Sequence, residues 1–313
     1  MKLKKYAWSV IGLAAVAFSI WLLYHEIRDL SLDELWDSLL AISTRDWVLC
    51  VLATLAAYGA LAGYDHLALL HLRKSVGWVY VTICSFTTYA LSHNIGASVF
   101  SGSMVRYRAY TAKGLSGAEV GVLVGFCSLT FALGTVMLTG LVLIIEPQLT
   151  ERFVDVLPVE ASAATGILLL ALVGLYVLGS ALKMWSLRIG SFAIHYPRLP
   201  IVGRQLVIGP LELLAAAAII YFALPEAGNP GFLIVLGIFL ISFSAALLSH
   251  APGGLGVLEL VFITGLSDMD PADVLAALLV FRLLYLIIPF ILALFVVLGF
   301  ERMQFSLKTD EGK

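Results

Sequence analysis

Long runs of apolar residues alternate with short polar connections along most of this chain. Each run reaches the roughly 20 residues that a helix needs to cross a bilayer core, and the runs lie at about 6–24, 47–70, 118–145, 163–182, 205–224 and 272–300. The pattern predicts six membrane-spanning helices. We expect the first to be retained, because its apolar run is longer than that of a signal peptide. Leucines share one face with Trp36 in residues 29–40, which predicts a short interfacial helix.

Two further apolar stretches each end in the same helix-breaking motif. The motif Ser-Phe-x4-Leu-Ser-His-x2-Gly begins at Ser85 and occurs again from Ser242. Broken helices at membrane depth survive where they line a cavity, and transporters built from internal repeats carry them in corresponding positions. We therefore predict one membrane domain, residues 1–313, with a first repeat at about 47–145 and a second at about 205–300.

The distribution of basic residues predicts how these two stretches enter the membrane. If about 78–113 and 231–267 are re-entrant hairpins, most of the 19 lysines and arginines face the cytoplasm; if both stretches span, the charges divide evenly. The first arrangement predicts an all-α polytopic membrane protein with six spanning helices and two inverted re-entrant helical hairpins, both termini being cytoplasmic. The segment 231–250 is long enough to span, and the sequence leaves that alternative open.

Composition agrees with a membrane protein and excludes several other classes. The chain is 61% hydrophobic and only 13% charged, which no soluble domain of this size requires. Its net charge of -2 gives no argument for nucleic acid. The three cysteines lie far apart in apolar runs, which predicts neither a disulfide framework nor a metal pair. The sequence has no phosphate-binding loop and no hydrolase motif, so we expect no ATPase activity and no cofactor.

Arg282 is the most informative charged residue, because it lies inside the last apolar run. An arginine there costs several kcal/mol unless it faces a cavity or a partner, so a functional role is the first interpretation. The alternatives are snorkelling to an interface and a structural ion pair with Glu259. Glu259 follows the Pro-Gly-Gly-Leu-Gly break and could pair with Arg282, carry a proton or meet a cationic head group.

His93 and His250 occupy equivalent positions in the two motifs. Each imidazole could bind a phosphate or relay protons, or it could satisfy backbone groups that the break leaves free. Metal binding by these two histidines and Glu259 is not expected, because the residues lack the helical spacing of metal ligands.

Arg106 and Arg108 follow a turn rich in glycine and serine within the first hairpin. Guanidinium groups suit phosphate, so Arg106 is favoured as a ligand, whereas Arg108 is favoured as a cytoplasmic anchor. Asp65 and Glu212 are expected to be interfacial or packing polar groups.

Two small features complete the helix predictions. Gly121 and Gly125 are expected to form a helix contact. Pro289 is expected to kink the last helix.

Residues 91–96, the arginine run 101–116, the Pro-Gly-Gly-Leu-Gly-Val-x-Glu motif 252–259 and Arg282 together resemble the lysylphosphatidylglycerol synthase/flippase membrane-domain family. The resemblance covers about 47–300 and implies the handling or flipping of lipids at the cytoplasmic membrane. It also implies a stand-alone member that lacks the aminoacyl-transfer domain.

These observations lead to one functional hypothesis and two alternatives. The hypothesis is a lipid flippase or transporter that works by alternating access in the inner membrane and binds membrane lipids, in particular anionic phospholipid. The alternatives are an intramembrane lipid-modifying enzyme and a scaffold for a lipid-biosynthetic enzyme. The predicted substrate-binding residues are Arg106, Arg282, Glu259, His93, His250, Asn94, Arg108, Gly253 and Gly254.

Overall fold

The computed structural model describes residues 32–95, 98–153, 162–183, 187–189, 192–194, 196–249 and 252–310. In these ranges the fold is helical apart from a short antiparallel ribbon of β1 (Leu187–Ile189) and β2 (Phe192–Ile194). The helices are α2 (Leu32–Ala41), α3 (Thr44–His71), α4 (Trp78–Ile95), α5 (Ser98–Thr111), α6 (Gly117–Ile145), η1 (Pro147–Phe153), α7 (Ala163–Ala181), α8 (Leu199–Ala223), α9 (Phe232–Ser249), η2 (Pro252–Gly254), α10 (Val257–Gly265), α11 (Pro271–Phe281), η3 (Arg282–Ile287) and α12 (Ile288–Asp310).

Five helical segments among the described residues are long and apolar enough to cross a membrane, so the chain is a multi-span membrane protein. They are α3, α6, α7, α8 and the continuous run of α11, η3 and α12 from Pro271 to Phe300. These five correspond to five of the six predicted spans. The sixth, at about 6–24, lies outside the described residues. The predicted short helix at 29–40 is present as α2.

Capping residues in the sequence explain where two of the spans begin. Ser116 caps α6 and forms a capping box with Glu119, in which each side chain binds the other residue's backbone N–H. Asp270 accepts a hydrogen bond from the backbone N–H of Ala272, and Pro271 occupies the first helical position of α11.

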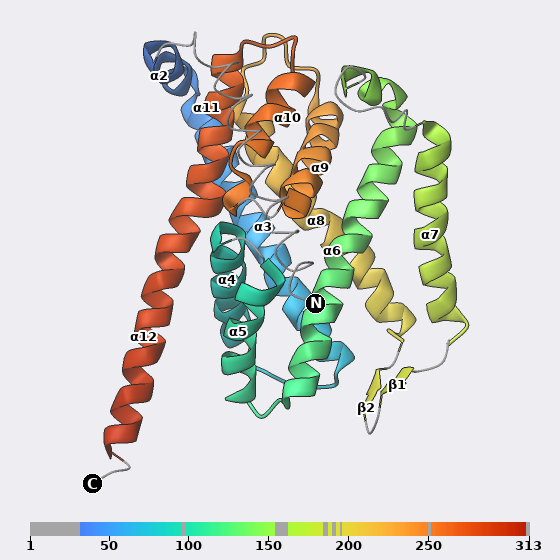
Figure 1. Ribbon diagram of the computed structural model, residues 1–313, viewed down its shortest axis with the longest axis vertical. Coiled ribbons are helices and arrows are strands. Elements are labelled where there is room, and N and C mark those ends of the chain that lie inside the picture. The colour runs from blue at the N-terminus through green and yellow to red at the C-terminus, as the bar shows by residue number, and fades with distance from the viewer. Residues whose placement is uncertain are drawn as a thin grey trace, which may run out of the picture.

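The two motif-bearing stretches each fold into a broken pair of helices. The pair α4–α5 fills the lower half of the molecule, and the pair α9–α10, joined through η2, fills the upper half (Figure 1). The pairs therefore extend inward from opposite ends of the bundle. They meet in the middle, where α4 contacts both η2 and η3.

The packing of the helices repeats between the two halves of the chain. Helices α3 and α8 pack against each other; α3 also contacts α4 and α6, as α8 contacts α9 and α11. Helix α4 packs on α12, and α9 packs on α6. The predicted duplication requires such matching neighbours, although the repeat boundaries at 47–145 and 205–300 stay a prediction.

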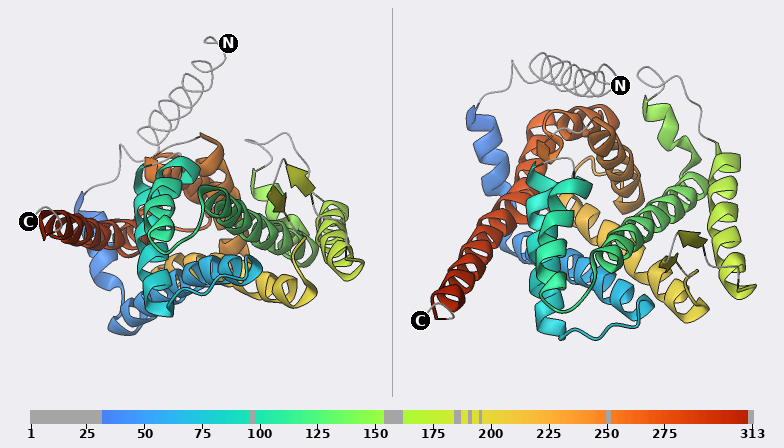
Figure 2. Two further views of the ribbon diagram at one scale, coloured as in Figure 1. Left: turned by 90° about the horizontal axis from the view of Figure 1, so that it is seen from below. Right: turned by 60° about the horizontal axis from the view of Figure 1, so that its bottom comes forward.

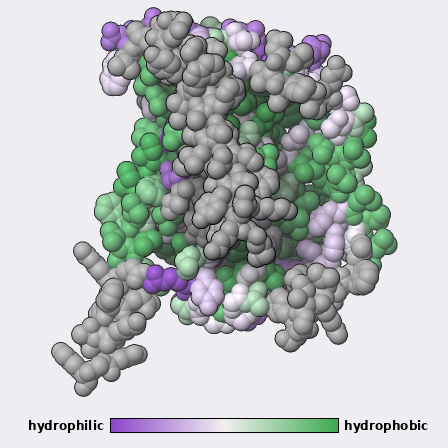
Figure 3. Space-filling view, viewed as in Figure 1, coloured by the Kyte–Doolittle hydropathy of each residue, from purple (hydrophilic) through white to green (hydrophobic). Residues whose placement is uncertain are grey.

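Short elements of the chain mark the two ends of the bundle. The ribbon β1–β2 and the end of α12 lie at the bottom, whereas α2 lies at the top (Figure 1). Helices α7 and α12 occupy opposite flanks of the bundle in both further views (Figure 2). Apolar side chains form a broad band between more polar ends, as a bilayer requires (Figure 3).

Glycine pairs allow α6 to approach two neighbouring helices closely. A Cβ atom on Gly134 would lie 2.6 Å from the carbonyl carbon of Gly209 in α8. A Cβ atom on Gly166 in α7 would lie 2.7 Å from the carbonyl oxygen of Gly140. The prediction of a helix contact at Gly121 and Gly125 is wrong for the described part of the chain. A Cβ atom at either position would meet nothing within 4 Å.

Replacing Gly134 with leucine should therefore destabilise the fold. The obstacle is backbone rather than a flexible side chain, so we expect the free energy of unfolding to fall by about 3 kcal/mol, the upper part of the usual range for overpacking. Thermal unfolding in detergent micelles would measure the loss. Gly121→Leu on the same helix is the matched control, and equal losses for the two variants would contradict the crossing at Gly134.

Candidate functional site

The last span contains a π-helix, η3, at the point where the broken helix pairs meet. The backbone N–H of Ile288 donates to the carbonyl of Leu283, five residues earlier, as in a π-helix. Pro289 has no N–H, so the regular ladder of backbone hydrogen bonds is interrupted directly after this bond. The hydroxyl of Tyr58 in α3 donates to the carbonyl of Tyr285 at 2.9 Å. The helix is thus held in its irregular form by a side chain from another span.

Asn94 joins the first broken pair to this π-helix. Its side-chain amide donates to the carbonyl of Leu286 at 3.1 Å and to the carbonyl of Ala90 in its own helix at 2.8 Å. The predicted site residue Asn94 therefore lies at the contact between α4 and η3. Here it satisfies backbone carbonyls of both.

Arg282, the first residue of the π-helix, binds the tip of the second broken pair. Its Nε donates to Oε1 of Glu259 at 2.6 Å, and its Nη1 donates to the carbonyl of Gly253 at 2.9 Å. Nη2 lies beside the same carboxylate oxygen but lacks hydrogen-bond geometry, and it is a buried donor without a hydrogen-bond partner. The ion pair with Glu259 that the sequence left open is present, and both Nε and Nη2 of the guanidinium group lie against the carboxylate.

Three glycines form the turn that holds this ion pair. Gly253, Gly254 and Gly256 have φ values of 59°, 66° and 77°, a region that residues with a Cβ rarely adopt. The turn lets the backbone N–H of Gly256 donate to Oε2 of Glu259 at 2.9 Å. The carboxylate of Glu259 thus sits at the positive N-terminus of α10, between a backbone donor and Arg282.

His93 contacts the π-helix through Tyr285 and lies among aromatic rings. Its ring stacks on that of Tyr285 at 5.3 Å and meets the edge of Phe243 at 6.3 Å. Phe243 belongs to the second copy of the motif, so the first copy's histidine contacts the second copy's phenylalanine. The Nδ1 atom of His93 is buried and has no hydrogen-bond partner. His250, the other predicted histidine, lies outside the described residues.

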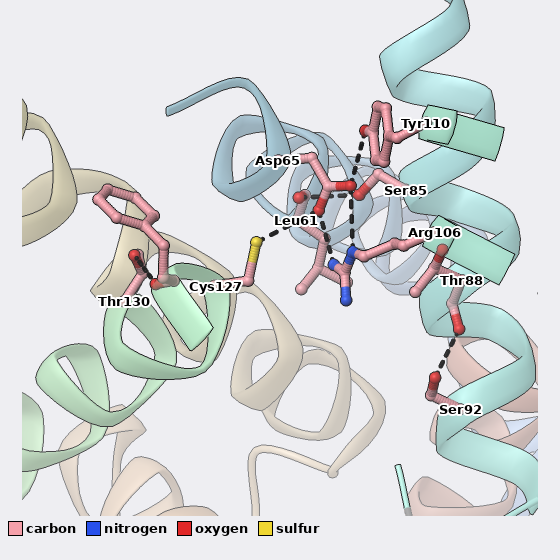
Figure 4. Close-up of polar contacts among 10 residues, drawn as sticks. Leu61, Asp65, Ser85, Thr88, Ser92, Arg106, Tyr110, Cys127 and Thr130 are labelled. Carbon is pink, nitrogen blue, oxygen red and sulfur yellow. Dashed lines mark hydrogen bonds and ion pairs between the residues drawn. The ribbon is translucent and has the colours of Figure 1, made fainter. Parts of the chain in front are cut away.

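A second buried ion pair lies between α3 and α5 (Figure 4). Asp65 accepts hydrogen bonds from Nη2 of Arg106 at 2.6 Å and from Nε at 3.2 Å. It also accepts from the hydroxyl of Tyr110 at 2.8 Å and from the thiol of Cys127 at 3.4 Å. Asp65 is 0% exposed and Arg106 is 5% exposed. The structure therefore gives Arg106 a partner within the protein, and its role as a lipid ligand stays a prediction.

Aromatic side chains separate this pair from Arg282. The guanidinium carbon of Arg106 lies 4.7 Å from the ring centroid of Tyr89, which in turn neighbours His93. Arg108 lies elsewhere: it is exposed, and its guanidinium carbon lies 6.0 Å from the ring centroid of Phe300.

Of the predicted site residues, His93, Asn94, Gly253, Glu259 and Arg282 gather around the π-helix, whereas Arg106 and Arg108 do not. Gly254 lies in the same turn as Gly253, where a Cβ atom would lie 3.1 Å from that of Ala246.

Two acids are more deeply buried than the sequence pattern predicts. Asp65 and Glu212 were expected to be interfacial or packing polar groups, yet both are buried in the bundle. Glu212 accepts a hydrogen bond from the hydroxyl of Tyr285, and its other oxygen has no partner. The rule that selected Arg282, that ionisable residues inside apolar runs default to function, would have selected both.

Replacing Tyr58 with phenylalanine removes the hydroxyl that binds the π-helix and should destabilise the fold. The buried hydrogen bond to the carbonyl of Tyr285 would be lost, so we expect the free energy of unfolding to fall by about 0.5–1.5 kcal/mol. Unfolding in mixed micelles would measure this, with Tyr107→Phe as control because Tyr107 is 51% exposed. A loss no greater than that of the control would show that another donor replaces the hydroxyl.

Comparison with known proteins places this architecture. The family model described as the lysylphosphatidylglycerol synthase TM region matches residues 9–293. The uncharacterized protein slr0712 of Synechocystis sp. is 29% identical over 92% of this chain and 89% of its own length. Inner membrane protein YbhN of Escherichia coli is 30% identical over 74% of this chain and 72% of its own.

A match to a longer protein covers only one part of it. Phosphatidylglycerol lysyltransferase of Bacillus subtilis is 24% identical over 96% of this chain but over only 35% of its own length. The chain thus spans about a third of that enzyme. With the family model matching nearly the whole chain, this multi-span membrane protein belongs to the lysylphosphatidylglycerol synthase TM region family, which is linked to phospholipid handling.

Proposed function

We propose that this protein moves a phospholipid, or a lipid with a similar head group, across the cytoplasmic membrane by alternating access. The observation that carries the proposal is the meeting of two oppositely directed broken helix pairs at Arg282, a buried cation held by Glu259 and by the carbonyl of Gly253. Transporters place their substrate sites at such breaks, near the middle of the bilayer.

The chemistry of this meeting point suits a lipid phosphate. Glu259 balances the charge of Arg282, so the arginine can stay buried while no lipid is bound. A phosphate offers acceptor oxygens to Nη2 and can compete with Glu259 for the remaining donors, because arginine binds both anions in the same forked geometry. The exchange of one anion for another would let the site load and release a head group.

The lengths of the broken helices support insertion without crossing. Helix α5 has 14 residues and extends about 21 Å at 1.5 Å per residue, and α10 has nine and extends about 14 Å. Both are shorter than the roughly 30 Å of a bilayer core. We therefore place α4–α5 and α9–α10 as re-entrant hairpins, the first from the cytoplasmic side and the second from the outside.

Cysteine labelling in intact cells tests this topology. In a background without the three native cysteines, Ser75→Cys and Lys113→Cys should react from the cytoplasmic side, because they flank the first hairpin and are exposed. Trp36→Cys in α2 should react from the outside. Reaction of positions 75 and 113 from opposite sides would show that the first hairpin crosses the membrane.

A reconstitution assay tests the function itself. Purified protein in phosphatidylcholine vesicles with trace fluorescent phosphatidylglycerol, phosphatidylethanolamine or phosphatidylcholine should expose inner-leaflet label to an impermeant quencher faster than protein-free vesicles do. Vesicles containing heat-denatured protein are the control. Translocation at the control rate for all three lipids would refute the proposal. Chemical conversion of a lipid head group instead would favour an intramembrane enzyme.

A further inference from the structure

We infer that Glu212 is an exchangeable proton-binding site and that the π-helix η3 links its occupancy to Arg282. The inference rests on the arrangement around Tyr285, and its link to transport rests on the function proposed above. It assigns the energy-coupling ion, which that proposal leaves open.

Glu212 is a buried acid of the bundle that has no counter-charge among the described residues. It lies on α8 and is 2% exposed. The hydroxyl of Tyr285 donates to its Oε1 at 2.5 Å, and its Oε2 is buried without a partner. A carboxylate in this position would carry an uncompensated charge in an apolar interior, which costs far more than a neutral carboxylic acid.

The other two acids that are buried among the described residues each have a basic partner: Asp65 binds Arg106 and Glu259 binds Arg282. Electrostatic neighbours of Glu212 among the described residues are three tyrosines: Tyr58 and Tyr64 from α3, and Tyr285 from η3. From α6, α7, α9 and α11, which also pack near α8, no charged side chain interacts with this carboxyl group in the described residues. A proton is therefore the cation that neutralises this acid.

Tyr285 connects this acid to the lipid site. It lies three residues after Arg282 in the same π-helix, stacks on His93 at 5.3 Å and donates its hydroxyl to Glu212. Loss of the proton from Glu212 would strengthen the hydrogen bond that the Tyr285 hydroxyl donates. The charged Oε2 would then require a new donor or a water molecule. Because π-helical segments are local irregularities that can rearrange, such a change would be passed to Arg282 and its contact with Gly253.

Infrared spectroscopy can detect this proton directly. Full-length protein in phosphatidylcholine vesicles should gain a carboxylic-acid carbonyl band when the pH is lowered from about 9 to about 6, a range in which ordinary glutamates, with a pKa of about 4.3, stay ionised. Glu212→Gln, which keeps an acceptor for Tyr285, should lose that band. Glu226→Gln, at an exposed loop position, should keep it, and Tyr285→Phe should shift its frequency.

Two results would overturn the site. One is a pH-dependent band that survives in Glu212→Gln. The other is a band that Glu212→Gln removes but that is present at both pH values in the unmodified protein, because it would mark a permanently neutral structural residue.

The coupling to transport has its own measurement. Lipid translocation by the unmodified protein should change between these pH values, and that dependence should be lost in Glu212→Gln; an unchanged dependence would overturn the coupling. A titrating Glu212 in a protein that moves no lipid would leave the proton site standing and refute the proposed function instead.

Discussion

Asp65→Asn is expected to lower the free energy of unfolding by about 3–5 kcal/mol, the usual cost of removing one partner from a buried ion pair. Asp65 holds Arg106 through two hydrogen bonds and also accepts from Tyr110 and Cys127. An asparagine at this position leaves the guanidinium group charged and without a counter-ion. Titration from mild detergent into mixed micelles with dodecyl sulfate would measure the unfolding.

The double variant Asp65→Asn with Arg106→Gln separates charge from shape. Removing both charges leaves no uncompensated ion, so we expect it to recover much of the loss of the single variant. Lys74→Met gives the matched comparison, because its bond to Glu119 is a partly exposed ion pair worth about 0–1 kcal/mol. If Asp65→Asn costs no more than Lys74→Met, the Arg106 side chain finds another partner or water, and the pair does not secure α5 to α3.

The sequence predicted the spans well because a bilayer imposes a minimum length on apolar runs. Five predicted spans agree with α3, α6, α7, α8 and the final segment to within a few residues, apart from an earlier start of α8 at Leu199. The helix breaks were predictable for a related reason. The three glycines that follow Pro252, at positions 253, 254 and 256, permit backbone conformations that end a helix, and all three have positive φ in the structure.

Pairing between side chains was harder to predict. Arg282 and Glu259 were considered together because both are ionisable residues of apolar segments, and they do form an ion pair. Asp65 and Arg106 lie on different helices, 41 residues apart in the chain, and no local spacing links them. Periodicity indicates which residues face inward, but only the packing of α4 and α6, the neighbours of α5, against α3 decides which of them meet.

The π-helix shows a further limit of local rules. Pro289 predicts an irregularity in the last helix, but the form of that irregularity depends on donors from elsewhere. Tyr58 donates a hydrogen bond to the carbonyl of Tyr285, and Asn94 donates one to the carbonyl of Leu286. Both donors come from other helices, so the segment acquires its shape only when the bundle assembles.

Replacing Arg282 with glutamine should reduce lipid translocation by about 10- to 150-fold. A charge-assisted hydrogen bond is worth about 1.5–3 kcal/mol, and each 1.4 kcal/mol is a factor of ten. The loss would arise because glutamine offers a neutral amide in place of the guanidinium donor at Nη2. The vesicle assay with fluorescent phosphatidylglycerol would measure it, with Arg108→Gln as control, because Arg108 is exposed and lies away from the π-helix.

The single variant alone cannot distinguish binding from folding, because it also leaves Glu259 buried without its cation. The double variant Arg282→Gln with Glu259→Gln removes that unpaired charge and should restore much of the thermal stability. Translocation should stay low in the double variant, since the donor for phosphate is still absent. If the double variant regains both stability and translocation, the pair serves only to hold the hairpin tip to the last span, and the head group binds elsewhere.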